Sequence, residues 1–181
     1  GAVSITQVTE RGQVHSLAEL RALCDVAKAY DLPVHLDGAR FANAMVALDC
    51  TPAEMTWKAG VDVVSFGGTK NGCIGVEAVI FFDPAKAWEF ELRRKRGAHL
   101  FSTHRYRSAQ MSAYLAGALW ITSAKTSNAN RARLIAGHKT VPVASFLFPS
   151  PTNMIFHCTH TAPHNPLFNA AAAVYPCSGP P

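Results

Sequence analysis

Apolar positions along the chain follow two periods, the alternation of short strands and the wider spacing of amphipathic helices. Short apolar runs bounded by glycine, proline or aspartate predict β-strands at 2–6, 34–36, 61–66 and 76–82. After the first run, Ser16 and Glu19 have the spacing of a capping box that opens a helix. Apolar residues then recur at helical spacing from Leu17 to Ala27, which predicts a helix that ends near Tyr30.

Further helices are predicted where start signals and helical spacing coincide, at 39–47, from Thr51, and at 84–96, 106–120 and 127–138. Strands that alternate with helices are typical of an α/β domain with a mainly parallel sheet. The strand at 76–82 is the exception, because only a glycine-rich turn separates it from the strand before it. That turn is too short for a crossover helix, so we expect this strand to be antiparallel to its neighbour.

The segment from Thr140 onwards has a different composition, with frequent proline. Strands are predicted at 141–148 and 154–156, and a helical turn at 170–173. Neither a long linker nor an internal repeat sets this segment apart from the rest of the chain.

Composition and charge narrow the classes of function. Of the 181 residues, 49% are apolar, which is typical of a globular domain, and the formal net charge is +5. The basic residues are scattered except at 93–96, where they predict a solvated helix face without an RNA-binding signature. No apolar run is long enough to cross a membrane. We therefore expect neither a nucleic-acid partner nor a membrane partner.

Five widely spaced cysteines without a CxxC pair argue against a disulfide framework and against a zinc site. Reduced thiols fit a cytoplasmic protein, and no metal is expected. The chain begins at Gly1 and enters a strand almost at once. We expect a fragment of a longer protein, with a processed or renumbered terminus as the alternative.

Asp37 and Lys70 are the residues most informative about chemistry. Each follows the end of a predicted strand, and they are 33 positions apart (70 − 37), the length of one strand–helix–strand unit. A right-handed crossover brings the two strands into one sheet, and ligands bind at the carboxyl ends of the strands in such sheets. Both side chains are therefore expected to face one crevice.

A lysine in a glycine-rich turn suits imine chemistry with an aldehyde, once burial and neighbouring positive charge have lowered its pKa. Gly67, Gly68 and Gly72 allow a flat cofactor to approach the backbone. A buried aspartate is the natural partner of a protonated pyridine nitrogen, and Arg40, three positions after Asp37, offers a fork that suits a carboxylate. Ordinary turns contain the same residue types, so spacing alone leaves both interpretations open.

Two longer segments carry a resemblance to a known family. Residues 35–44, HLDGARFANA, resemble the H-x-D-G-A-R segment of threonine aldolases and their β-eliminating lyase relatives. Residues 65–72, SFGGTKNG, resemble the cofactor-lysine segment of the low-specificity L-threonine aldolase branch. The similarity runs from about Ala2 to Trp120, with the two motifs in the order and at the separation found in that family.

The resemblance implies a fold-type-I aminotransferase-like architecture, with a three-layer α/β arrangement around a mainly parallel sheet. Residues 1–120 would form the C-terminal part of the pyridoxal-phosphate-binding large domain, and residues 121–181 a partial or divergent small domain. It also implies a homodimer or homotetramer with shared active sites. Lys95 and Arg105 would then lie near the phosphate bound by the partner, although Thr103 stands where the family has a lysine.

The resemblance also implies roles at the crevice. Lys70 would hold pyridoxal 5′-phosphate as a Schiff base, and Asp37 would pair with its pyridine nitrogen. Arg40 would contact the cofactor oxygen or a substrate carboxylate. The phosphate cradle and the stacking ring of the family have no recognisable counterpart here, so we expect the chain alone to bind the cofactor poorly.

The activity implied is retro-aldol cleavage of L-threonine and other β-hydroxy amino acids to glycine and an aldehyde. A base must take the β-hydroxyl proton, and His35, His99 and His104 are candidates by residue type, with a structural role as the alternative for each. Two other hypotheses stay open. One is a non-catalytic remnant or interaction domain that keeps the fold, and the other is a related lyase that cleaves a different bond.

Overall fold

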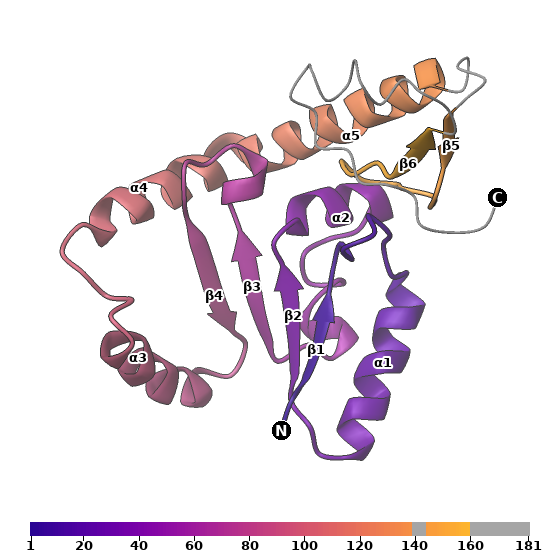
Figure 1. The fold of residues 1–181 in the computed structure, drawn as a ribbon. Helices are drawn as coiled ribbons and strands as arrows, with labels where there is room; N and C mark the ends of the chain where they lie inside the picture. Colours follow the sequence, from indigo (N-terminus) through magenta and orange to yellow (C-terminus); the bar gives the residue numbers. More distant parts are fainter. Residues whose placement is uncertain (139–143, 160–181) are drawn as a thin grey trace.

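The computed structural model describes residues 1–138 and 144–159, which form a four-stranded sheet, flanking helices and a two-stranded ribbon (Figure 1). The strands of the sheet are β1 (Val3–Thr6), β2 (Val34–Gly38), β3 (Val63–Gly67) and β4 (Glu77–Phe81). The helices are α1 (Leu17–Ala29), α2 (Phe41–Leu48), α3 (Ala87–Arg96), α4 (His104–Leu115) and α5 (Leu119–His138). The ribbon pairs β5 (Ala144–Phe146) with β6 (His157–Thr159).

The order of strands in the sheet is β1-β2-β3-β4. The first three strands are parallel, and β4 is antiparallel to β3, as the short turn between them predicts. The predicted α/β architecture with a mainly parallel sheet is therefore confirmed. Thr6 pairs with Asp37, and Asp37 pairs with Ser65. The ends of the three parallel strands thus meet along one side of the sheet, called here the carboxyl edge.

One face of the sheet forms the hydrophobic core. Ile5, Leu36 and Val64 lie in register on the three parallel strands, and each is buried. They belong to one cluster with Leu20 of α1 and Phe41 of α2. Because side chains alternate along a strand, every second position points away from this core. The opposite face is accordingly more polar and less buried.

The start of α1 has the predicted capping box. The Ser16 hydroxyl accepts a hydrogen bond from the Glu19 backbone N–H, at 3.2 Å, and the Glu19 carboxylate accepts one from the Ser16 N–H, at 2.7 Å. Leu20, Cys24 and Ala27 are buried along one face of the helix, as their spacing predicts. Local sequence alone therefore accounts for where this helix begins and which side faces the core.

The helix predicted from Thr51 does not extend. The Thr51–Glu54 capping contacts form, but only a turn and the 3₁₀ segment Trp57–Ala59 follow. Gly60 ends that segment with φ +106°, a left-handed conformation that suits glycine. The start signal was correct, and the nearby glycine kept the helix short.

The break predicted between the last two helices, 106–120 and 127–138, is also misplaced. The chain leaves helical geometry at Gly117, where φ is +57°, inside the 3₁₀ turn Ala116–Ala118. The helix that follows, α5, is continuous from Leu119 to His138. Gly117 adopts this conformation at little steric cost, and Ala118 follows it with φ +59°, so the change of direction extends over both residues.

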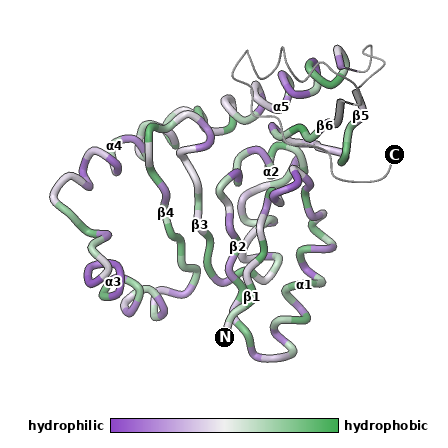
Figure 2. The backbone as a smooth tube through the Cα atoms, in the orientation of Figure 1, coloured by the Kyte–Doolittle hydropathy of each residue, from purple (hydrophilic) through white to green (hydrophobic). Residues whose placement is uncertain are grey.

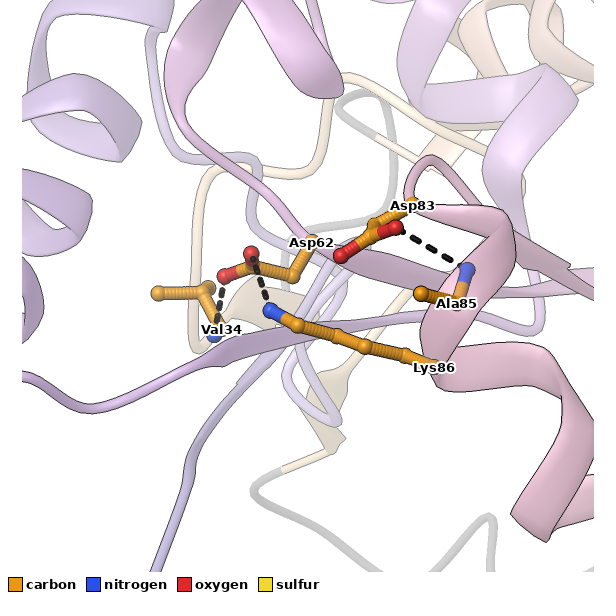
Figure 3. Close-up of polar contacts among 5 residues, drawn as sticks. All are labelled: Val34, Asp62, Asp83, Ala85 and Lys86. Carbon is orange, nitrogen blue, oxygen red and sulfur yellow. Dashed lines mark hydrogen bonds and ion pairs between the residues drawn. The ribbon is translucent and has the colours of Figure 1, made fainter.

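The amino ends of the strands are held by a cluster of complete polar contacts (Figure 3). The Asp62 carboxylate accepts a hydrogen bond from the Val34 N–H at 2.8 Å and forms an ion pair with Lys86 at 3.3 Å. The Asp83 carboxylate caps the next turn by accepting from the Ala85 N–H at 3.0 Å. These contacts join the starts of β2 and β3 to the turn after β4.

The C-terminal ribbon matches the predictions only in part. β5 lies within the predicted strand 141–148, whereas β6 begins at His157 and not at 154. Residues 139–143 and the helical turn predicted at 170–173 lie outside the described residues. Within 1–138 and 144–159, no helix is long and apolar enough to cross a membrane, and no group of three or more potential metal ligands is found.

Candidate functional site

Two turns from separate parts of the sequence touch at the carboxyl edge. One follows β2 and contains Asp37 and Arg40, and the other follows β3 and contains Lys70 in the 3₁₀ segment Thr69–Asn71. A Cβ added at Gly67 would lie 2.6 Å from the carbonyl oxygen of Ala39 and 2.8 Å from its Cα. Only a glycine permits so close an approach, so the two predicted motifs form one continuous surface.

Asp37 is the second-last residue of β2, and its side chain is half-buried. One carboxylate oxygen, Oδ1, accepts a hydrogen bond from the Ala39 N–H at 3.0 Å, which fixes the turn into α2. Among the described residues, this is the only hydrogen bond that the carboxylate makes. Oδ2 is therefore available to a group that carries a proton or a positive charge.

Lys70 has an exposed side chain on a firmly held backbone. The next residue, Asn71, is buried, and its amide donates to the Tyr114 hydroxyl and to the Trp120 carbonyl, the latter at 2.8 Å. The Ser123 hydroxyl donates to the Asn71 carbonyl at 3.1 Å. Within the part of the chain that the structure describes, the Lys70 amine itself has no hydrogen bond or ion pair, so it is open to a ligand. The burial expected for this lysine is not found, because the turn presents its side chain to solvent.

Arg40 is half-buried at the start of α2, and its Nε–H is buried without a hydrogen-bond partner among the described residues. Burial lowers the pKa of its guanidinium from the usual value, because desolvation disfavours the charged form. Buried donors are rarely left unpaired in proteins. The Nε–H groups of Arg94 in α3 and Arg131 in α5 are orphaned in the same way. The Arg40 N–H indicates a bound acceptor, such as a phenolate or carboxylate oxygen, because it lies at the ligand-binding edge of the sheet.

Lys95 and Arg105 do not reach the carboxyl edge within this chain. Both are exposed, and Arg105 bonds only to its neighbours, the Ser102 carbonyl and the Tyr106 hydroxyl. Lys95 belongs to α3, a largely hydrophilic helix that buries none of its residues (Figure 2). Figure 1 shows α3 near the opposite end of β4 from the Lys70 turn. Their role toward a phosphate stays a prediction.

The three candidate histidines have different surroundings. His35 lies between two serines on the polar face of the sheet, and its Nδ1 and Nε2 atoms are each 2.8 Å from a hydroxyl, of Ser4 and Ser65. Both ring nitrogens are thus occupied by hydroxyls of this chain, which favours a structural role. His104 contacts the Phe101 backbone, and His99 is exposed after α3. None of the three is brought beside Lys70 by a recorded contact.

The residues that sequence reasoning missed are those that hold the Lys70 turn. Asn71, Tyr114 and Ser123 all contribute hydrogen bonds there. Asn71 and Tyr114 are 43 positions apart, so no local period connects them. The available signal was indirect, a polar residue directly after the candidate lysine in a segment otherwise rich in glycine.

The arrangement suits pyridoxal 5′-phosphate in three respects. The free Lys70 amine faces solvent at a ligand-binding edge, Asp37 keeps one oxygen unpaired, and the Arg40 Nε–H lacks an acceptor. An aldehyde, a protonated ring nitrogen and a phenolate are the complementary groups on that cofactor. The residues present therefore fit its ring.

Comparison with known proteins gives a consistent result. Residues 1–162 match the family model described as Beta-eliminating lyase. The low specificity L-threonine aldolase of Pseudomonas sp. (strain NCIMB 10558) is 42% identical over 154 residues, which are 85% of this chain and 44% of that protein. The low specificity L-threonine aldolase of Pseudomonas aeruginosa is 44% identical over 156 residues, again 85% of this chain and 44% of that protein.

A solved structure supports the same fold. Threonine aldolase from Leishmania major superposes with a TM-score of 0.73 at 26% identity, over 86% of this chain and 45% of that one. The chain therefore spans less than half of the length of each of these relatives.

Proposed function

The chain belongs to the beta-eliminating lyase family, and on that premise we propose that it forms part of a pyridoxal-phosphate-dependent threonine aldolase. The reaction would be retro-aldol cleavage of L-threonine and other β-hydroxy amino acids to glycine and an aldehyde. Members of this family depend on pyridoxal 5′-phosphate, and the threonine aldolases among them are lyases that act on small amino acids.

The cofactor, when bound, supplies an aldehyde for the lysine and a ring that takes up the electron pair left by the broken Cα–Cβ bond. Lys70 would hold that aldehyde, since its amine has no competing partner among the described residues. Asp37 would keep the ring nitrogen protonated through its free oxygen, and a charge pair of this kind keeps the ring electron-poor. Arg40 would bind the ring oxygen or the substrate carboxylate.

The proposal extends to assembly and organisation. A homodimer or homotetramer would allow the exposed Lys95 and Arg105 to approach the phosphate in a neighbouring subunit. Residues 1–120 would belong to the large domain and 121–181 to a small domain, with the change of direction at Gly117 close to this boundary. Cys24, Cys50 and Cys73 are free thiols, which supports a cytoplasmic location.

The unpaired Arg40 Nε–H, beside an aspartate and a lysine on one edge, carries this proposal. The test is a chimera in which this chain replaces the matching 156 residues of the P. aeruginosa relative. With threonine it is expected to release glycine and acetaldehyde in equal amounts. Release of ammonia and a 2-oxo acid would indicate a different lyase reaction, and no product would contradict the proposal.

Asp37→Asn in the chimera separates an effect on catalysis from an effect on folding. The amide keeps an oxygen for the Ala39 N–H but loses the charge, so kcat is expected to fall by about 10²-fold or more, as loss of one preorganised electrostatic partner does. The matched control is Asp49→Asn, at an exposed left-handed position after α2. It is expected to leave the rate within about twofold, because asparagine tolerates that conformation.

A further inference from the structure

The turn that carries Lys70 is anchored at its base and exposed at its tip. Val76 is buried and Cys73 packs against the core, whereas Ile74 is 94% exposed. Polar contacts between Thr69 and Val76 join the ends of the turn, and the Cys73 N–H donates to the Gly68 carbonyl inside it. The exposed tip has few apolar contacts to resist local opening, so hydrogen bonds from outside the turn help to hold the backbone near Lys70.

Those hydrogen bonds come from one face of α4. The Gln110 side-chain oxygen accepts from the backbone N–H groups of Ile74 and Gly75, at 3.0 and 3.2 Å. The Arg107 guanidinium donates to the Gly75 carbonyl at 2.7 Å. Residues 107, 110 and 114 are spaced i, i+3 and i+7, which places them on the same side of a helix.

The same helix face continues to the other side of the lysine. Tyr114 is buried, and its hydroxyl accepts the hydrogen bond from Asn71. Burial raises the pKa of this phenol, so it stays neutral over the ordinary pH range. The turn is thus held at Asn71 and again at residues 74–75, while the Lys70 amine between the end of β3 and these points stays free.

We propose that Gln110 is a positioning residue for Lys70, acting through the amides of Ile74 and Gly75 together with Arg107. The inference rests on the proposed function, because that function supplies the cofactor with which the Lys70 amine reacts. An amine that forms a covalent bond must approach the aldehyde in a narrow range of distance and angle, and small displacements cost large factors in rate. Holding the backbone from α4 limits that range before the cofactor arrives.

The test compares two substitutions of similar length. Gln110→Met removes the acceptor, whereas Gln110→Glu keeps an oxygen for both N–H groups and lies three residues from Arg107. Hydrogen exchange at the Ile74 and Gly75 amides measures the strength of their bonds to residue 110 without any cofactor. Gln110→Met is expected to speed exchange about tenfold, which corresponds to about 1.4 kcal/mol, and Gln110→Glu to leave it within about twofold.

The second readout is reductive labelling of the chimera described above with pyridoxal 5′-phosphate and cyanoborohydride, followed by peptide mapping. The exposed Lys58 serves as the internal control, so the quantity measured is the ratio of labelling at Lys70 to that at Lys58. Gln110→Met is expected to lower this ratio at least threefold, whereas Gln110→Glu is expected to leave it at the unsubstituted value. Arg107→Met, which removes the bond to Gly75, should lower it in the same direction.

The outcomes separate this inference from the proposed function. A ratio near one in the unsubstituted chimera means that Lys70 has no special reactivity toward the cofactor, which contradicts both the proposed function and the positioning role. A high ratio that Gln110→Met and Arg107→Met leave unchanged overturns the positioning role alone. If Gln110→Met does not fold, the other two variants still decide the positioning role. A labelling ratio that Arg107→Met leaves unchanged overturns it. A ratio that Gln110→Glu lowers at least threefold overturns it as well.

Discussion

The two edges of the sheet differ in whether their charged side chains find partners within the chain. At the amino edge the Asp62 carboxylate is shared between the Val34 N–H and Lys86, and Asp83 caps a turn. At the carboxyl edge Arg40 keeps an unpaired Nε–H, and the Lys70 amine has no recorded partner in the described part of the chain. Polar side chains are present at both edges, but among the described residues the carboxyl edge is the one where the Arg40 Nε–H, one Asp37 oxygen and the Lys70 amine have no partner in the chain.

This difference gives a criterion that separates stabilising charges from functional ones. A charge whose hydrogen bonds are complete contributes to the free energy of unfolding and offers nothing to a ligand. A buried or edge-placed group that lacks a partner costs stability unless something else binds to it. Changes at the paired charges of the amino edge should therefore cost stability without loss of chemistry, and changes at the unpaired groups of the carboxyl edge should cost chemistry without loss of fold.

The largest expected effect is at Lys70. Lys70→Ala in the chimera should lower kcat/KM by more than about 10³-fold, because the amine that carries the cofactor is removed. Its exposed side chain makes no recorded contact with other described residues, so the free energy of unfolding should change by less than about 0.5 kcal/mol. Chemical denaturation and glycine production measure the two quantities. A large loss in the free energy of unfolding together with the loss in kcat/KM would contradict the distinction between the two edges.

Asp62→Ala should give the opposite result. It leaves the Val34 N–H without its acceptor and Lys86 without its counter-ion, and should lower the free energy of unfolding by about 1–3 kcal/mol. The ratio of Lys70 to Lys58 labelling should stay the same. Lys86→Met is the matched control, because it removes only a partly exposed ion pair worth about 0–1 kcal/mol. A changed labelling ratio in Asp62→Ala would mean that the edges are coupled.

The smallest effect concerns Glu19, a carboxylate in the first turn of α1 that is also bonded within the chain. The hydrogen bond from the Ser16 backbone N–H, with one from the Ser16 hydroxyl, lowers the pKa of Glu19 below its ordinary value of 4.5. A carboxyl with a depressed folded-state pKa stabilises the fold above its unfolded pKa and loses that contribution as pH falls.

Glu19→Gln should therefore lower Tm slightly near neutral pH, and the difference from the unsubstituted chain should shrink as pH falls through and below 4.5. Thermal unfolding followed by circular dichroism at a series of pH values measures this difference. A difference that stays constant with pH would show that the capping box depends on shape and not on charge.

The sequence was sufficient for those parts of the fold that local patterns determine. Strand ends and turn residues placed Asp37 and Lys70 on neighbouring strands, and the structure puts both at the carboxyl edge. The antiparallel β4 followed from the length of one turn. The roles of Asp37, Arg40, Lys70, Lys95 and Arg105 remain predictions.

The parts that could not be predicted depend on distant contacts. The bonds from Gln110 to Ile74 and Gly75 span 36 and 35 positions, and no period in the sequence reports them. The break at Gly117 was legible as a glycine between two helical stretches, but the apolar spacing continued across it. The unpaired Arg40 Nε–H depends on burial by the whole fold.

The contact between Gly67 and Ala39 leaves no room for a side chain at position 67. With only 2.6 Å from a hypothetical Cβ at 67 to the Ala39 oxygen, even one added methyl group would act as a wedge between the two turns. The contacted atoms belong to the backbone of Ala39, so no change of side chain at 39 could make space for it. Position 67 is thus closed to every residue that carries a Cβ, however small.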